Sequence, residues 1–232
     1  MVKLKPKKQI DVYQEVWRKY SSPIMDGKFE PLEESFTWHG REWANQNNPP
    51  FLACVFKMPS EFWEPIQLVQ AELERTDLRQ RYYQPNYFHV TLEEYGWEDE
   101  VSFEHIAETM REMLSGYRPF TIELKGLNCF SRTLFVKVFD RSRSFSGMYK
   151  DIHKRFPNSK KEHPEYIPHL AVADVVTDEA RDLIALIEKR YREERIGQVN
   201  VDRIHIVRAR PYLTVGRVET VGIIPLNSAR IG

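Results

Sequence analysis

Residues 88–92 read Phe-His-Val-Thr-Leu, and residues 168–172 read Pro-His-Leu-Ala-Val. Each stretch is an apolar run that contains one histidine and a small residue two positions after it. Because side chains alternate between the two faces of a strand, His89 shares a face with Thr91, and His169 shares a face with Ala171. If the two strands lie side by side in a pseudo-symmetric fold, their imidazoles face each other across one cleft. Such a pair can supply an acid and a base near neutral pH.

The composition is that of a folded protein with balanced charge. The chain has 232 residues, of which 41% are hydrophobic and 29% are charged. A chain of this length and polarity can bury a substantial core, as one large domain or as two merged lobes. Its 34 Lys and Arg residues equal its 34 Asp and Glu residues, so no overall positive field attracts long nucleic acids. A small phosphate ligand, in contrast, needs only a handful of side chains.

The cysteines and the lengths of the apolar runs predict the compartment in which the protein is found. Cys54 and Cys129 lie in apolar, strand-like stretches, which predicts two buried thiols and no disulfide framework. The first residues are basic and lack the apolar stretch of a secretory signal. No run approaches the roughly 20 apolar residues that cross a membrane. We therefore expect a cytoplasmic protein that does not enter a membrane.

Residues 1–50 differ in pattern from the rest of the chain. Residues 11–20 have the apolar spacing of a helix, and turn residues with little periodicity follow. Because the large rings of Trp17, Trp38 and Trp43 favour burial, we expect an N-terminal extension that packs on the main body. The alternative is a lid over the cleft. Residues 51–232 are expected to form the main domain, with two lobes.

Regular alternation of strands and helices begins at residue 51. Apolar spacing predicts strands near residues 51–56, 88–92, 121–125, 134–139, 168–172, 199–207 and 214–224. It predicts helices near residues 62–73, 103–114, 145–156 and 177–191. Strands mixed with helices in two similar halves predict an α+β fold, in which an antiparallel sheet from each half faces a central groove and the helices lie outside.

The paired histidine motifs and this order of elements, over residues 51–226, resemble the 2H phosphoesterase superfamily. That family includes 2′-5′ RNA ligase-like proteins and cyclic nucleotide phosphodiesterases, and its motif is His-x-Thr/Ser followed by an apolar residue. The resemblance implies a bilobal, pseudo-symmetric fold that acts on phosphodiesters and 2′,3′-cyclic phosphates without a metal or cofactor. It also implies that His89 and His169 are the catalytic pair and that Thr91 binds phosphate.

The second motif departs from the family pattern, because Ala171 stands where a Thr or Ser is expected. A hydrogen bond to a charged group contributes about 1.5–3 kcal/mol, which is roughly ten- to hundred-fold in rate. An acid or base contributes on the order of 10²–10⁴-fold. Losing one hydroxyl therefore weakens or redirects activity, whereas both histidines, the larger contributors, are present.

Three further residues are candidates for substrate binding. Tyr87 shares the face of His89 because it lies two residues earlier. Arg210 and Tyr212 lie near a closing strand. No His-x-x-x-His, Cys-x-x-Cys or similar metal-ligand spacing is present, so no metal is expected. The helical histidines His105 and His153 have charged neighbours and are expected to be exposed.

The expected substrate is a small phosphate ester or nucleotide, including an RNA end, and the oligomeric state is left open. The main hypothesis is hydrolysis of a cyclic phosphate by the two histidines. One alternative is a nucleotide- or phosphate-binding module with weakened or lost catalysis, which Ala171 would signal. The other is 2′-5′ RNA end-joining, which the same histidines could serve. Turnover of cyclic nucleotides in EDTA separates these cases.

Overall fold

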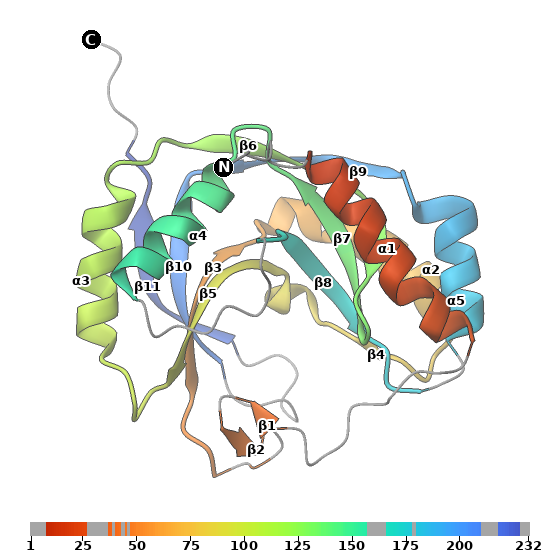
Figure 1. Ribbon diagram of the computed structural model, residues 1–232, viewed down its shortest axis with the longest axis horizontal. Coiled ribbons are helices and arrows are strands. Elements are labelled where there is room, and N and C mark those ends of the chain that lie inside the picture. The colour runs from red at the N-terminus through yellow and green to blue at the C-terminus, as the bar shows by residue number, and fades with distance from the viewer. Residues whose placement is uncertain are drawn as a thin grey trace, which may run out of the picture.

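One antiparallel sheet runs through the residues that the computed structural model describes, which are 8–26, 37–38, 40–42, 45, 47–156, 166–177, 180–209 and 218–227 (Figure 1). Within this part of the chain the sheet has nine strands: eight follow the order β11-β10-β3-β5-β8-β7-β6-β9, and the ninth, β4, pairs with β8 beside this row. The strands are β3 (Phe51–Lys57), β4 (Arg81–Tyr82), β5 (His89–Trp97), β6 (Phe120–Cys129), β7 (Thr133–Phe139), β8 (His169–Asp174), β9 (Arg195–Val201), β10 (Arg203–Ala209) and β11 (Val218–Pro225). A separate hairpin joins β1 (Thr37–Trp38) to β2 (Arg41–Glu42).

The two halves of the sheet meet at the histidine strands. β5 pairs with β8 in antiparallel fashion, with Val90 opposite Leu170. The sheets expected from the two halves are therefore continuous with each other, and the predicted α+β fold is confirmed.

Helices cover the sheet on the side opposite the histidines. They are α2 (Trp63–Thr76), α3 (Phe103–Leu114), α4 (Ser144–Arg155) and α5 (Arg181–Leu186), which continues into a π-helical turn (Ile187–Tyr191). The helices form because their apolar residues recur at helical spacing, as in α3, where Ile106, Met110 and Leu114 are buried. These stripes share one core with Val90 and Leu170, which alternate with the histidines along β5 and β8.

A further helix, α1 (Gln9–Met25), packs on the histidine side of the sheet, and Figure 1 shows it lying alongside β7. Its residues Tyr13 and Val16 form a small apolar cluster with Phe135 of β7. Phe135 is the cross-strand partner of Ala171 and therefore lies on the same face as His169. The boundary at residue 50 stays a prediction.

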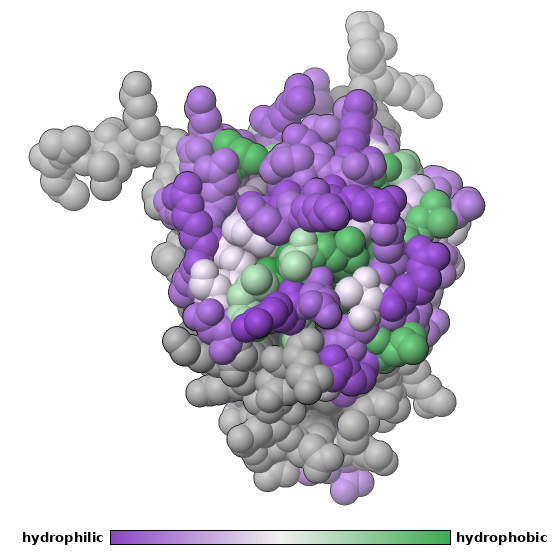
Figure 2. All heavy atoms as spheres, turned by 90° about the vertical axis from the view of Figure 1, so that its right-hand side faces the viewer, coloured by the Kyte–Doolittle hydropathy of each residue, from purple (hydrophilic) through white to green (hydrophobic). Residues whose placement is uncertain are grey.

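The side of the molecule where α1, α5 and α2 lie is mostly hydrophilic, with apolar residues gathered in a hollow at its centre (Figure 2). No helix in the described ranges has the length and apolar character that crossing a membrane requires. The cytoplasmic location stays a prediction.

Two local expectations were wrong. Residues 199–207 are not one strand: β9 ends at Val201 and pairs with β6 at one end of the sheet, whereas β10 begins at Arg203 and pairs with β3 and β11 toward the other end. His153 is not exposed, since its Nδ1 lies 2.9 Å from Glu93 Oε2 and the residue is 9% exposed. Its partner lies on β5, far away in the sequence, so the charged neighbours of His153 along α4 gave the wrong indication. His105 is exposed, as expected.

Candidate active site

The two motif histidines lie on neighbouring strands and face the same side. Antiparallel pairing of Val90 with Leu170 places His89 opposite Ala171 and Thr91 opposite His169. Each histidine is thus adjacent to the small residue of the other motif. Both histidines keep part of their surface accessible, so a ligand can reach them.

Each imidazole is oriented by the same backbone contact. His89 Nδ1 is hydrogen-bonded to the carbonyl of Tyr87, and His169 Nδ1 lies 2.9 Å from the carbonyl oxygen of Ile167. A carbonyl oxygen only accepts hydrogen bonds, so Nδ1 carries the proton in both rings. Nε2 is left on each ring as the atom that can take or give a proton.

Aromatic rings pack against both imidazoles. Tyr87 meets His89 edge-on with ring centroids 4.9 Å apart, and Tyr83 stacks on Tyr87 at 4.5 Å. Phe130 meets His169 in the same edge-on manner at 5.0 Å, with Phe135 at 5.3 Å. These contacts restrict ring rotation and exclude water from one side of each imidazole.

The surroundings of His89 favour its neutral form. Burial is the main cause that brings the pKa of His89 down to about 4. The hydrogen bond to Tyr87 acts in the opposite direction, and the charges of His169 and Lys57 lower the pKa as well. At neutral pH, His89 is therefore an uncharged imidazole whose Nε2 can accept a proton.

Lys57 is a residue of this face that the sequence analysis missed. It ends β3 as the cross-strand partner of His89, and its ammonium donates a hydrogen bond to Thr220 Oγ1 at 3.3 Å. Among the described residues no carboxylate lies within ion-pair distance of this ammonium, and burial lowers its pKa. The only sequence signal is its place at the end of an apolar strand, and strand pairing cannot be read from that. His205 on β10 lies on the same face, opposite Val55.

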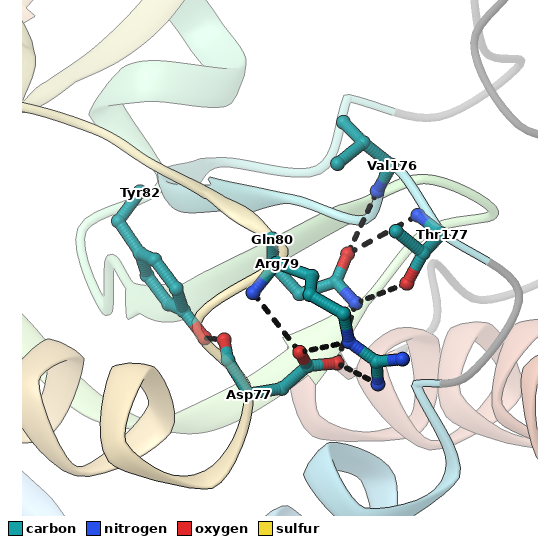
Figure 3. A network of polar contacts seen from close by, with 6 residues as sticks. All are labelled: Asp77, Arg79, Gln80, Tyr82, Val176 and Thr177. Carbon is teal, nitrogen blue, oxygen red and sulfur yellow. Dashed lines mark hydrogen bonds and ion pairs between the residues drawn. The ribbon is translucent and has the colours of Figure 1, made fainter.

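The end of β8 distant from His169 is held by a polar network (Figure 3). Gln80 is its centre: its Oε1 accepts the Val176 N–H at 2.8 Å, and its Nε2 donates to Thr177 Oγ1 at 2.8 Å and to Asp77 Oδ2 at 2.7 Å. Gln80 and Asp77 are both buried. Because β4 starts directly after Gln80 and pairs with β8, the network supports the register of the strand that carries His169.

The structure brings four of the six candidate residues together: His89, His169, Thr91 and Tyr87. Arg210 and Tyr212 lie outside the described residues. In the described ranges, no group of three His, Cys, Asp or Glu side chains could hold a metal ion. The lack of a cofactor stays a prediction.

Comparison with known proteins gives a family match. Residues 58–219 match the model described as the 2′-5′ RNA ligase superfamily. This span contains both histidine strands and excludes α1 and β3. The chain is also 24% identical to the RNA 2′,3′-cyclic phosphodiesterase of Methanothermobacter thermautotrophicus over 149 residues, which cover 62% of this chain and 81% of that protein.

Solved structures resemble the fold. TT0787 of Thermus thermophilus superposes with a TM-score of 0.61 at 15% identity, covering 76% of this chain and 97% of that one. LigT of E. coli in its apo form gives a TM-score of 0.56 at 17% identity, covering 78% of this chain and 99% of that one. At such identities these likenesses show the fold alone.

Proposed function

Because the chain belongs to the 2′-5′ RNA ligase superfamily, we propose that it is a metal-independent phosphoesterase with His89 and His169 as its acid–base pair. Its substrate is a 2′,3′-cyclic phosphate on a nucleotide or at an RNA end. The observation that carries the proposal is the arrangement of the two imidazoles on adjacent strands, each with Nδ1 bound to a backbone carbonyl.

Hydrolysis needs one base and one acid. The neutral Nε2 of His89 takes a proton from water, and the water oxygen forms a bond to phosphorus. The bond from phosphorus to one ribose oxygen breaks, and the protonated Nε2 of His169 gives that oxygen its proton. The lowered pKa of His89 supports its role as the base. Because one ring must be neutral and the other protonated, the pH optimum belongs to the pair and not to either ring alone.

The developing negative charge is held by groups beside each ring. Thr91 lies opposite His169 and offers a hydroxyl, whereas Ala171 opposite His89 offers none. Lys57 lies next to His89 on its other side, and its ammonium can supply the missing electrostatic stabilisation. Structures of LigT with 3′-AMP and with phosphate support a ligand of this class.

The size of the substrate follows from the charge of the chain. Equal numbers of acidic and basic residues do not attract a long polyanion. The chain therefore acts on a small nucleotide or on the end of an RNA.

Turnover in EDTA tests the proposal. Purified protein is incubated with 2′,3′-cyclic AMP and, as a negative substrate, 3′,5′-cyclic AMP. We expect ring opening of the first, loss of that activity in His89→Ala, and retention in His105→Ala, which changes an exposed histidine on α3. Absence of turnover by the wild-type protein contradicts the proposal.

A nucleotide-binding module is the second candidate, because Ala171 removes one hydroxyl of the family motif. Isothermal titration with 2′,3′-cyclic AMP distinguishes it: tight binding without turnover supports the module. End-joining, in which a 5′-hydroxyl takes the place of water as the group that attacks phosphorus, is assayed with an RNA that carries a 2′,3′-cyclic phosphate and a second RNA with a 5′-hydroxyl.

A further inference from the structure

The strand pairing beside His169 ends at a proline. β7 and β8 pair as far as Lys137 opposite His169, so the next pair along the ladder would be Val138 opposite Pro168. Proline has no N–H and cannot donate to the opposite strand. The ladder therefore lacks a donor next to the second histidine.

The hydroxyl of Tyr13 occupies this place. It accepts a hydrogen bond from the Val138 N–H at 3.0 Å. Its own proton lies within reach of two carbonyl oxygens, that of Val138 at 2.8 Å and that of Pro168. One side chain of α1 thus bridges the two strands at the residue that precedes His169.

Tyr13 is itself held firmly. The residue is 1% exposed, and its ring packs edge-on against Phe139 with centroids 5.1 Å apart. Its carbonyl accepts a hydrogen bond from Asn128 Nδ2 at 2.8 Å. One helical turn earlier, Gln9 Nε2 donates to the Val138 carbonyl at 2.7 Å. The hydroxyl therefore has little freedom to leave the ladder.

The segment before His169 is also held at its first residue, Tyr166. Tyr166 donates a hydrogen bond from its hydroxyl to the carbonyl of Thr91 at 2.7 Å. Between these two tyrosine contacts lies Ile167, whose carbonyl binds Nδ1 of His169. The orientation of the imidazole thus depends on a short segment fixed at both ends.

We propose that Tyr13 is a positioning residue for His169, acting through the Pro168 carbonyl from a helix outside the matched family span. A small displacement of a catalytic group costs on the order of 10²-fold in rate. Through this contact, α1 helps to hold the imidazole of His169 in position relative to the imidazole of His89. The kinetic consequence rests on the proposed function.

Tyr13→Phe tests the proposal because it keeps the buried ring and removes only the hydroxyl. We expect kcat on 2′,3′-cyclic AMP to fall about ten- to hundred-fold while KM changes less than about twofold. Tyr20→Phe is the matched control: it removes a hydroxyl from the same helix that makes no hydrogen bond with the described residues. Ser21→Ala is a second control: it removes a hydrogen bond to the Trp17 carbonyl within α1 and leaves the contacts of the Tyr13 hydroxyl in place.

All variants are assayed at a temperature where circular dichroism shows them folded. A Tyr13→Phe protein that unfolds more easily and keeps the wild-type kcat would reduce Tyr13 to a structural residue and overturn the proposal. A fall in kcat that Ser21→Ala reproduces would do the same.

A second readout is independent of turnover. The imidazole Cε1–H signals of His89 and His169 are followed by NMR, with assignments from the single His→Asn variants. Tyr13→Phe should shift the His169 signal and leave that of His89 in place, and an unchanged His169 signal overturns the proposal. Failure of the proposed function would instead appear as an inactive wild-type protein.

Discussion

The His89 half and the His169 half of the site orient their imidazoles in the same way, but different groups bind the backbone before each histidine. In both, Nδ1 binds the carbonyl two residues earlier and an aromatic ring meets the imidazole edge-on. The carbonyl of Phe88, just before His89, accepts the main-chain N–H of Met58 at 2.9 Å. The equivalent carbonyl of Pro168 is bound by a side chain, the Tyr13 hydroxyl.

The neighbours of the two rings differ as well. His169 has the hydroxyl of Thr91 on one side and Lys137 on the other, and the Lys137 ammonium is paired with Glu193. His89 has the methyl group of Ala171 on one side and Lys57 on the other, and the Lys57 ammonium is bound to Thr220. The first half thus has a backbone contact and a lysine with no carboxylate partner among the described residues. The second has a hydroxyl, a lysine paired with a carboxylate, and the N-terminal helix. The two motifs thus share the contact that orients each imidazole and differ in the groups around it.

Replacing either histidine should have the strongest effect. His89→Ala and His169→Ala should each lower kcat/KM for 2′,3′-cyclic AMP by about 10²–10⁴-fold, because each removes an acid or base. A nitrophenyl phosphodiester separates the roles, since its leaving group needs no proton. With it, His169→Ala should retain most activity and His89→Ala should not; the reverse order would exchange the two roles.

Lys57→Met should have the next largest effect. It removes a charge–phosphate contact of about 1.5–3 kcal/mol, or roughly ten- to hundred-fold in kcat/KM. The charge of Lys57 also lowers the pKa of His89. Since the base must be neutral to act, removing this charge raises that pKa and moves the acidic limb of the pH–rate profile to higher pH. Lys154→Met, which changes an exposed lysine, is the control. If the acidic limb of the Lys57→Met profile stays in place, Lys57 does not influence the protonation of His89 and the prediction is wrong.

Ala171→Thr should make the two halves more alike. A hydroxyl opposite His89 adds a donor for phosphate, and we expect kcat/KM to rise by up to about tenfold, the lower end of one hydrogen bond to a charged group. Ala171→Val has nearly the same shape without the hydroxyl. If both variants behave alike, the hydroxyl of the family motif is not what this position lacks.

His89 should also make stability depend on pH. Its pKa is lowered to about 4 in the folded protein, so between about pH 6.5 and pH 4 the unfolded chain binds more protons. The free energy of unfolding therefore falls as pH falls through this range, with a contribution on the order of 1–3 kcal/mol. His205, whose pKa burial also lowers to about 4, adds to this slope. Urea titrations of wild type and His89→Asn should show a flatter dependence in the variant; parallel curves would contradict the lowered pKa.

Local patterns were enough to predict the paired strands and the fold class. Alternation along residues 88–92 and 168–172 places each histidine on one face, and repetition of the motif indicates that the faces meet. The 2H phosphoesterase resemblance is confirmed by the family match, and the roles of the individual residues stay predictions.

The residues that the sequence analysis missed or misjudged are placed by contacts between distant parts of the chain. Lys57 is ordinary in sequence and reaches the site because β3 pairs with β5. Tyr13 is one of several aromatic residues on a helical stripe, and its place in the ladder depends on the proline at position 168. His153 was misjudged because its partner, Glu93, is on another element.

The central claim is that both imidazoles act on one phosphoryl group. A crystal structure of the protein with 3′-AMP or vanadate bound tests it most directly. The account predicts one phosphate or vanadate with oxygens within about 3 Å of Nε2 of both His89 and His169. A ligand that contacts only one of these atoms, or that binds on another face of the sheet, would contradict it.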